Sequence, residues 1–349
     1  MPLDTIYLTR HGHRLNWTID HKTGTYKSQF PTPSGNPSDP TLTSHGVRQA
    51  HELATHILSD NVTPKPFRVY SSPFWRCLQT IEPTVRALGA TKANNRTTSG
   101  VEDDAEFEIR IENGLGEWFG STTFFDHPTP PTLESLCQTP TTATTTTPFT
   151  LNKARKLPIL YTSTRGESIP QLHNRLATTL SALIAEVDAE IISLESSLPL
   201  ERRTSKSILI CSHAAPLIAI GRVLTGHVPA DSNEEDFYVY TAGLSTFRRV
   251  RHQQKEGGLG LSHIGDKKAE EVLAPGTRII DYNGTAVSDW EGGKGVGGGW
   301  DCLVNGDCGF LSGGAERGWH FNGEESFDTG PMTETSISAD GNMKLGTKL

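Results

Sequence analysis

The chain has 349 residues, enough for one large domain or two smaller ones, and its 35% hydrophobic and 21% charged residues are typical of a globular protein. It holds 32 Lys and Arg against 40 Asp and Glu, a formal net charge of −8, which argues against a broad surface for the nucleic-acid backbone. The sequence has no uninterrupted apolar stretch of the roughly 18 to 20 residues that span a membrane, and no basic and apolar start typical of a signal peptide. We therefore expect an intracellular protein, cytoplasmic or nuclear, that contacts neither membrane nor nucleic acid directly. The five cysteines form no C-x-x-C pair, which favours reduced thiols over a disulfide framework or a zinc site.

The first predicted elements alternate between strand and helix. Residues 5–9 are a β-branched run that ends at Arg10-His11-Gly12, as a buried strand before a tight turn would. The polar residues 21–40 predict a long surface loop. A helix then begins at Thr43-Ser44, and its expected apolar face is formed by Val47, Ala50, Ala54, Ile57 and Leu58.

The same alternation continues to residue 224. A strand at 67–70 ends at Ser71-Ser72-Pro73, and helical spacing of apolar residues follows up to Val85. Residues 169–194 predict the longest amphipathic helix, residues 207–211 a strand buried on both faces, and residues 214–224 another helix. This recurrence predicts an α/β fold, a three-layer α/β/α sandwich around a mostly parallel, doubly wound sheet.

Composition divides the chain into two parts. We expect residues 1–250 to form one domain with insertions at about 20–40 and 120–164, the second of which contains a Pro/Thr-rich stretch at 128–149 that we expect to be mobile. More than half of the 34 glycines lie after residue 250. Residues 251–349 are therefore expected to form a Gly-rich, irregular and partly ordered C-terminal appendage.

Ionisable residues gather just beyond a predicted strand or in a loop. They lie in four clusters: 10–14, 71–76, 112–117 and 212–214. The carboxyl ends of strands in an open α/β sheet meet in one crevice, so these clusters can share a pocket. Arg10, Arg14 and Arg76 would hold the oxygens of a phosphoryl group, which predicts a phosphate site that needs no metal or other cofactor.

The same pocket contains candidates for each chemical role. A histidine among arginines has its pKa lowered, so neutral His11 can attack phosphorus as the nucleophile. His213 would donate a hydrogen bond to the phosphoryl oxygens, and Glu117 is the candidate acid for the departing alkoxide. Glu112 and Glu167 remain alternatives for that acid.

Five motifs in this order resemble the histidine phosphatase, or phosphoglycerate-mutase-like, superfamily. They are Leu8-Thr9-Arg10-His11-Gly12, Leu42-Thr43-x-x-Gly46-x-x-Gln49-Ala50, Ser71-Ser72-Pro73-x-x-Arg76-x-x-x-Thr80, Gly166-Glu167-Ser168 and Ser212-His213. The resemblance implies a metal-independent phosphomonoesterase with a phosphohistidine intermediate on His11, phosphate binding by Arg10, Arg14, Arg76 and His213, and acid/base work by Glu117.

The segment from Glu112 to Trp118 and the long loop before Asp39 are most similar to one branch of that superfamily. This branch contains the suppressor-of-T-cell-receptor-signalling phosphatases and the fungal tau-55 subunit of transcription factor IIIC. The resemblance therefore implies two kinds of partner, a phosphorylated small molecule or phosphoprotein as substrate, or a complex like transcription factor IIIC in which the chain is an assembly subunit. His13 and Arg14 depart from the mutase pattern, which makes a phosphoglycerate-mutase-type phosphotransferase the less favoured reading.

Simpler readings exist for several of these residues. His11-x-His13 could be a metal pair of the amidohydrolase kind, although no matching later set of His, Lys and Asp is present. Arg76 could form a surface ion pair with Glu82. Trp17, Trp75 or Trp118 could supply an aromatic wall for a flat leaving group.

Overall fold

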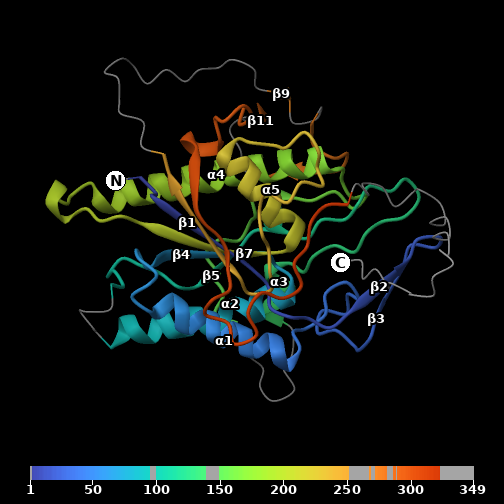
Figure 1. The fold of residues 1–349 in the computed structure, drawn as a ribbon, viewed down its shortest axis with the longest axis horizontal. Coiled ribbons are helices and arrows are strands. Elements are labelled where there is room, and N and C mark those ends of the chain that lie inside the picture. The colour runs from blue at the N-terminus through green and yellow to red at the C-terminus, as the bar shows by residue number, and fades with distance from the viewer. Residues whose placement is uncertain are drawn as a thin grey trace.

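A computed structural model describes residues 2–94, 100–138, 149–250, 267–268, 272–280, 286–287 and 289–322. Its centre is a six-stranded sheet in the order β12-β8-β1-β7-β4-β5 (Figure 1). Four neighbours are parallel, namely β1 (Thr5–Arg10), β7 (Ser207–Ser212), β4 (Pro66–Ser71) and β5 (Ile109–Ile111). On the other side, β8 (Leu244–Arg249) runs antiparallel to β1, and β12 (Trp300–Asp307) runs antiparallel to β8.

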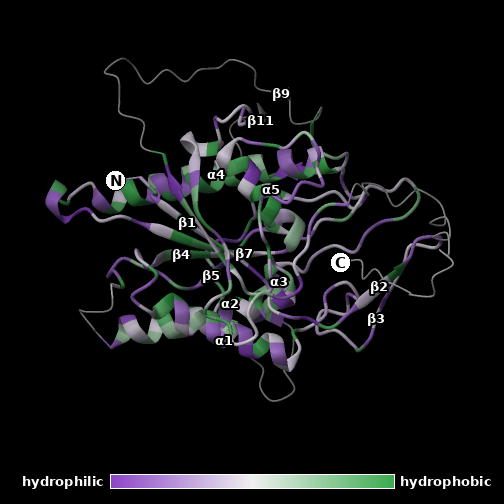
Figure 2. Ribbon diagram, in the orientation of Figure 1, coloured by the Kyte–Doolittle hydropathy of each residue, from purple (hydrophilic) through white to green (hydrophobic). Residues whose placement is uncertain are grey.

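Helices cover both faces of this sheet. Helices α1 (Ser44–Leu58) and α2 (Trp75–Ala93) pack together on one face, and α4 (Ile169–Glu195) and α5 (Ala214–Thr225) pack on the other (Figure 1). Every residue of β1, β4 and β7 is buried, and Figure 2 shows hydrophobic and hydrophilic residues mixed along α1 and α4, as expected of helices with one face on the core. The predicted three-layer α/β/α sandwich with a mostly parallel sheet is confirmed. No helix in the described ranges is both long and apolar enough to cross a membrane.

Local sequence signals set the helix boundaries. The Thr43 side chain accepts from the Gly46 backbone N–H and caps α1, and Ser168 forms a capping box with Gln171 at the start of α4. Helix α5 ends at Gly226, whose φ of 75° suits a left-handed cap. Val47 was expected on the apolar face of α1, but it is 41% exposed, because Gly46 instead lies against the loop at His13 and turns its neighbour outward.

The insertions contain more structure than their composition predicted. A hairpin of β2 (Trp17–Asp20) and β3 (Thr25–Ser28) extends into the expected loop at 21–40, and β3 lies within that range. The second insertion holds the short helix α3 (Leu133–Gln138), and β6 (Leu160–Tyr161) pairs with β10 (Arg278–Ile279). Much of the stretch expected to be mobile, residues 139–148, lies outside the described residues.

The Gly-rich segment contributes to the central sheet. Residues 300–307 were assigned to the irregular appendage, yet they form the edge strand β12, whose first residue, Trp300, is only 2% exposed. Glycine composition concealed this strand because the adjoining turns need left-handed backbone, as at Gly295 and Gly299. Three 3-10 helices complete the description, at Asn113–Leu115, Leu200–Arg202 and Val296–Gly298, together with the paired strands β9 (Lys267–Lys268) and β11 (Ala286–Val287).

Candidate active site

The four sequence clusters meet at the carboxyl ends of the parallel strands. His11 follows β1, Arg76 lies in the first turn of α2 after β4, Glu117 follows β5, and His213 follows β7. His11, Glu117 and His213 are all buried, and each offers an atom within 4.8 Å of the other two. The expected convergence at one edge of the sheet is therefore present in the structure.

Hydrogen bonds to two motif side chains, Thr80 and Gln49, hold the loop that carries His11. The Gly12 N–H donates to Thr80 Oγ1 at 2.9 Å, and the His13 N–H donates to Gln49 Oε1 at 2.8 Å. A Cβ on Gly12 would lie 2.8 Å from the carbonyl oxygen of Gly46. Only glycine lets the loop after β1 approach the start of α1 this closely.

His11 is arranged as a nucleophile. Its Nδ1 lies 2.8 Å from the Gly12 carbonyl oxygen, so the proton belongs on Nδ1 and the lone pair on Nε2. Burial, followed by the charges of Arg76, Arg10 and Arg14, holds the pKa of His11 well below its usual 6.5. The imidazole is therefore neutral at physiological pH.

His213 stands at the N-cap position of α5 and faces His11. Its Nε2 lies 2.8 Å from Ser72 Oγ, its Nδ1 lies 3.3 Å from Glu117 Oε2, and its ring centroid is 5.4 Å from that of His11. Burial and the nearby Arg76 lower the pKa of His213 well below 6.5. Two neutral imidazoles thus stand side by side in a cationic pocket.

Arg76 links the site to the first insertion. It is fully buried, and its Nη2 donates to Glu117 Oε2 at 3.0 Å, while its Nη1 lies 3.5 Å from Asp39 Oδ1. The alternative ion pair with Glu82 is wrong, because Glu82 pairs with Arg86 at 2.6 Å. Sequence analysis assigned no role to Asp39. Asp39 precedes Arg76 by 37 residues, and nothing in the sequence shows that its loop returns to the start of α2.

Asp39 stabilises the start of α2 as well as Arg76. Its Oδ1 accepts from the Trp75 N–H at 2.8 Å, where a carboxylate also interacts favourably with the helix dipole. Burial raises the pKa of Asp39 to about 6, and Arg76 opposes this shift. Arg76 therefore stabilises the ionised form of Asp39.

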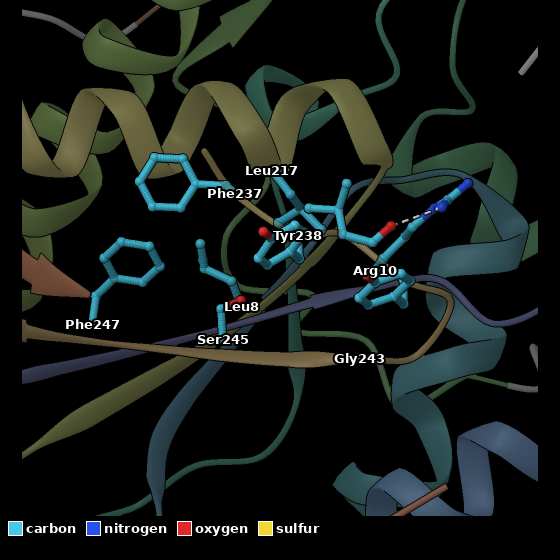
Figure 3. A pocket seen from close by; sticks show the side chains of 10 residues that line it. Leu8, Arg10, Leu217, Phe237, Tyr238, Gly243, Ser245 and Phe247 are labelled. Atoms are coloured by element: carbon cyan, nitrogen blue, oxygen red, sulfur yellow. Dashed lines mark hydrogen bonds between the residues drawn. The ribbon is translucent and has the colours of Figure 1, made fainter. Parts of the chain in front are cut away.

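Arg10 and Arg14 complete the ring of positive charge. Arg10 donates to the Val239 carbonyl at 2.9 Å, the contact drawn in Figure 3, and Arg14 donates to the Leu15 carbonyl at 2.9 Å. Burial and neighbouring arginines lower the pKa of Arg10 to about 10 and that of Arg14 to about 9. The Nε atoms of Arg10 and Arg76 are buried without a hydrogen-bond partner. Crowded guanidiniums with unused donors favour a bound anion.

The small cavity in Figure 3 includes Arg10 in its lining but none of His11, Glu117 and His213. Its volume is about 10 Å³, and it is lined mainly by apolar side chains of α5 and the strand region around β8, such as Leu217 and Phe247. It has room for little more than one water molecule. We assign it to packing around Arg10 rather than to substrate.

The structure separates the three candidate glutamates. Glu112 is bound by Arg155 at 2.9 Å and by the backbone N–H groups of Gly114 and Ile159, and Glu167 is bound by Arg175 at 2.5 to 3.0 Å. Both carboxylates therefore stabilise loops. Glu117 alone of the three contacts His213 and Arg76.

The alternative metal and aromatic readings receive little support from the geometry. His13 is not in the cluster with His11; its Nδ1 lies 2.9 Å from Thr43 Oγ1. The grouping of His11, Glu117 and His213 could ligate a cation geometrically, but the arginines around it disfavour a second positive charge.

Of the three tryptophans, Trp17 is the one in contact with a pocket arginine, since Arg14 lies 5.8 Å from its ring centroid. Trp75 packs on Phe149, and Trp118 donates to the Glu167 carbonyl.

Residues 6–122 match the family model described as Histidine phosphatase superfamily (branch 1). The resemblance predicted from the motifs is confirmed, because the matched part of the chain is similar to the histidine phosphatase superfamily and carries His11, Arg76 and Glu117.

Two curated relatives share about a quarter of their aligned residues with the chain. The transcription factor tau 55 kDa subunit of Saccharomyces cerevisiae is 26% identical over 329 residues, which cover 92% of this chain and 59% of that protein. An ecdysteroid-phosphate phosphatase of Drosophila melanogaster is 26% identical over 248 residues, 66% of this chain and 28% of that protein. The chain thus spans about three fifths of the first relative and less than a third of the second.

Among solved structures, the ecdysone phosphate phosphatase of Bombix mori in complex with tungstate is 16% identical, with a TM-score of 0.46 over 73% of this chain and 96% of that one.

Proposed function

We propose that the protein is a metal-independent phosphomonoesterase that works through a phosphohistidine on His11. The observation that carries this proposal is the neutral imidazole of His11, with its lone pair on Nε2, held among the buried guanidiniums of Arg10, Arg14 and Arg76. A phosphate dianion is the ligand that satisfies this excess of positive charge and the unused Nε donors.

In the first half-reaction, His11 Nε2 attacks phosphorus and the bond from phosphorus to the ester oxygen breaks. Arg10, Arg14 and Arg76 hold the equatorial oxygens, and His213 donates a further hydrogen bond to them. Glu117 acts as the general acid and gives its proton to the departing alkoxide.

In the second half-reaction, water replaces the alcohol. The Glu117 carboxylate takes a proton from water as its oxygen attacks phosphorus, and the bond from phosphorus to Nε2 breaks. Inorganic phosphate leaves and His11 returns to its neutral form. The same groups act in both half-reactions, with Glu117 donating a proton in the first and accepting one in the second.

The test is hydrolysis of an aryl phosphate in the presence of a metal chelator. His11→Ala should abolish turnover and leave the circular dichroism spectrum unchanged, whereas the matched control His13→Ala, whose ring contacts Thr43 outside the cluster, should retain most activity. Acid-labile, base-stable phosphate should be trapped on the wild-type chain but not on His11→Ala. Full activity of His11→Ala would overturn the proposal.

A second function is supported by the coverage of one relative. The match to the tau 55 kDa subunit extends over 92% of this chain, far beyond the 66% matched by the phosphatase relative. We therefore propose as the alternative that the chain is an assembly subunit of a transcription factor IIIC-like complex, located in the nucleus, with weak or no catalysis. Recovery of this chain alone by affinity purification from a native extract would count against it. The two functions are compatible, since an occupied pocket does not prevent assembly.

A further inference from the structure

A turn from the C-terminal segment lies against the proposed catalytic loop. The Arg317 carbonyl oxygen accepts a hydrogen bond from Arg10 Nη1 at 2.5 Å. Arg10, which directly precedes the proposed nucleophile His11, is thus hydrogen-bonded to this turn. The loop between α5 and β8 joins them, because the Ala242 N–H donates to the Arg10 carbonyl and the Thr241 N–H donates to the Glu316 carbonyl. Residue 317 is thus adjacent to the site although 306 positions separate it from His11.

Glu316 anchors the turn to α1. Its carboxylate lies 2.6 Å from His45 Nε2 and 3.2 Å from Gln49 Nε2, and Gln49 in turn accepts from the His13 N–H. The carboxylate of Glu316 is therefore committed to α1 and is not the counterion of its neighbour Arg317. This anchoring fixes the backbone at residue 317.

The backbone at this junction is strained. Among the described residues, Ala242 with a φ of 57° and Arg317 with a φ of 50° are the non-glycine residues with positive φ, and both lie at this junction. Such conformations are unfavourable for residues with a Cβ and persist where the surroundings impose them, commonly at functional sites. A glycine would adopt the positive φ at residue 317 more readily than an arginine. The presence of an arginine at this position therefore suggests that its side chain has a function.

The Arg317 side chain is an exposed cation at the rim of a buried site. In the described part of the chain, its guanidinium forms no ion pair or side-chain hydrogen bond. Its charge is close enough to lower the pKa of Arg10, Arg14 and His13, after the larger effect of burial on each. Arg10 and Arg14 themselves are only 8% and 6% exposed.

We propose that Arg317 forms a second anion subsite at the rim of the phosphate pocket. The preferred ligands are phosphomonoesters that carry another anionic group, a carboxylate or a second phosphate, beyond the ester oxygen. This inference rests on the proposed function for the identity of the inner pocket. Arg317 is then a specificity residue, since it contacts the outer group and takes no part in the bond changes at phosphorus.

The test compares two non-hydrolysable ligands that differ in one charge. Binding of 3-carboxybenzylphosphonate and 3-carbamoylbenzylphosphonate is measured by calorimetry at a pH where both phosphonates are dianions. Wild type should bind the carboxylate about three- to tenfold more tightly, the range expected for one partly exposed charge pair, and the preference should shrink at high salt. Equal affinities would overturn the inference.

Variants identify the residue responsible. Arg317→Gly deletes the guanidinium and suits the positive φ, so it should bind both ligands equally, while Arg317→Lys should keep part of the preference. The control Arg202→Gln removes an exposed charge from the 3-10 helix at 200–202 and should keep the full preference. Retained preference in Arg317→Gly, or its loss in the control, would refute the inference.

Hydrolysis of 3-carboxyphenyl phosphate separates the two proposals. If no phosphate is released but the ligand preference depends on Arg317, the proposed enzyme activity fails and the subsite stands. If 3-carboxyphenyl phosphate and 3-carbamoylphenyl phosphate are hydrolysed with equal kcat/KM, the enzyme activity stands and the subsite fails.

Discussion

The role of Glu117 leads to a quantitative prediction, because its carboxylate is shared between two site residues. Its Oε2 lies 3.0 Å from Arg76 Nη2 and 3.3 Å from His213 Nδ1, and its Oε1 accepts from the Trp118 N–H at 3.0 Å. Glu117→Gln preserves the shape and one acceptor oxygen. It removes the proton that the proposed mechanism delivers to the leaving oxygen.

The expected loss depends on the leaving group. A positioned general acid contributes about 10²- to 10⁴-fold, so kcat on an alkyl phosphate should fall by that factor in Glu117→Gln. Nitrophenolate departs without a proton, so the loss on 4-nitrophenyl phosphate should be below about tenfold. Arg76 keeps its contacts with Asp39 and the Ser38 carbonyl, so the free energy of unfolding should fall by only about 1–3 kcal/mol.

The assay is steady-state kinetics on both esters, with chemical denaturation of each variant. Glu112→Gln and Glu167→Gln are the matched controls, since these carboxylates bind Arg155 and Arg175 and should affect stability without changing the ratio of the two rates. Equal losses on the two esters in Glu117→Gln would refute the reasoning, and a leaving-group effect in either control would transfer the acid role to that residue.

Three further predictions concern the surroundings of the site. Asp39→Asn weakens the buried contact with Arg76 and the cap on Trp75, so unfolding free energy should fall by about 1–3 kcal/mol with a higher KM; unchanged values of both would contradict this role. Burial lowers the pKa of His173 to about 4. As the pH falls below about 6.5, His173 is protonated in the unfolded chain before it is protonated in the folded one. The free energy of unfolding is therefore highest above pH 6.5 and decreases towards pH 4. By pH 5 the loss in unfolding free energy is about 2 kcal/mol. In His173→Phe, the decrease in unfolding free energy between pH 7 and pH 5 should be smaller by that amount. Trp300→Ala should cost about 3–5 kcal/mol in a single unfolding transition, whereas separate transitions would show that β12 is not part of the cooperative unit.

The main elements were predictable because each depends on neighbouring residues. Helix α4 matches the predicted range at 169–194 within a residue, since its capping box and apolar spacing are both local. Strand β7 was equally clear as a continuous apolar run, and α5 followed it as predicted. The prediction for Val47 was wrong because Gly46 packs against the distant loop at His13 and Val47 is left exposed. The hairpin of Trp17–Asp20 with Thr25–Ser28 was not predicted, because its polar residues resemble a loop.

The sequence alone determined which residue types the pocket contains and which motifs deliver them. Arg10, His11, Arg76 and His213 each follow a predicted strand, and parallel strands bring their carboxyl ends together. That much requires only the order of the elements along the chain. The strand before Glu117, β5, was not predicted.

Only the tertiary structure decided which partners these groups have. It separated Glu117 from Glu112 and Glu167, brought Asp39 to Arg76, and placed Arg317 beside Arg10. The physical reason is that hydrogen bonds and ion pairs are set by distances of about 3 Å between side chains far apart in sequence, and no local propensity encodes such distances. Residue types along the chain therefore indicated the kind of site, while tertiary packing determined which side chains contact one another within it.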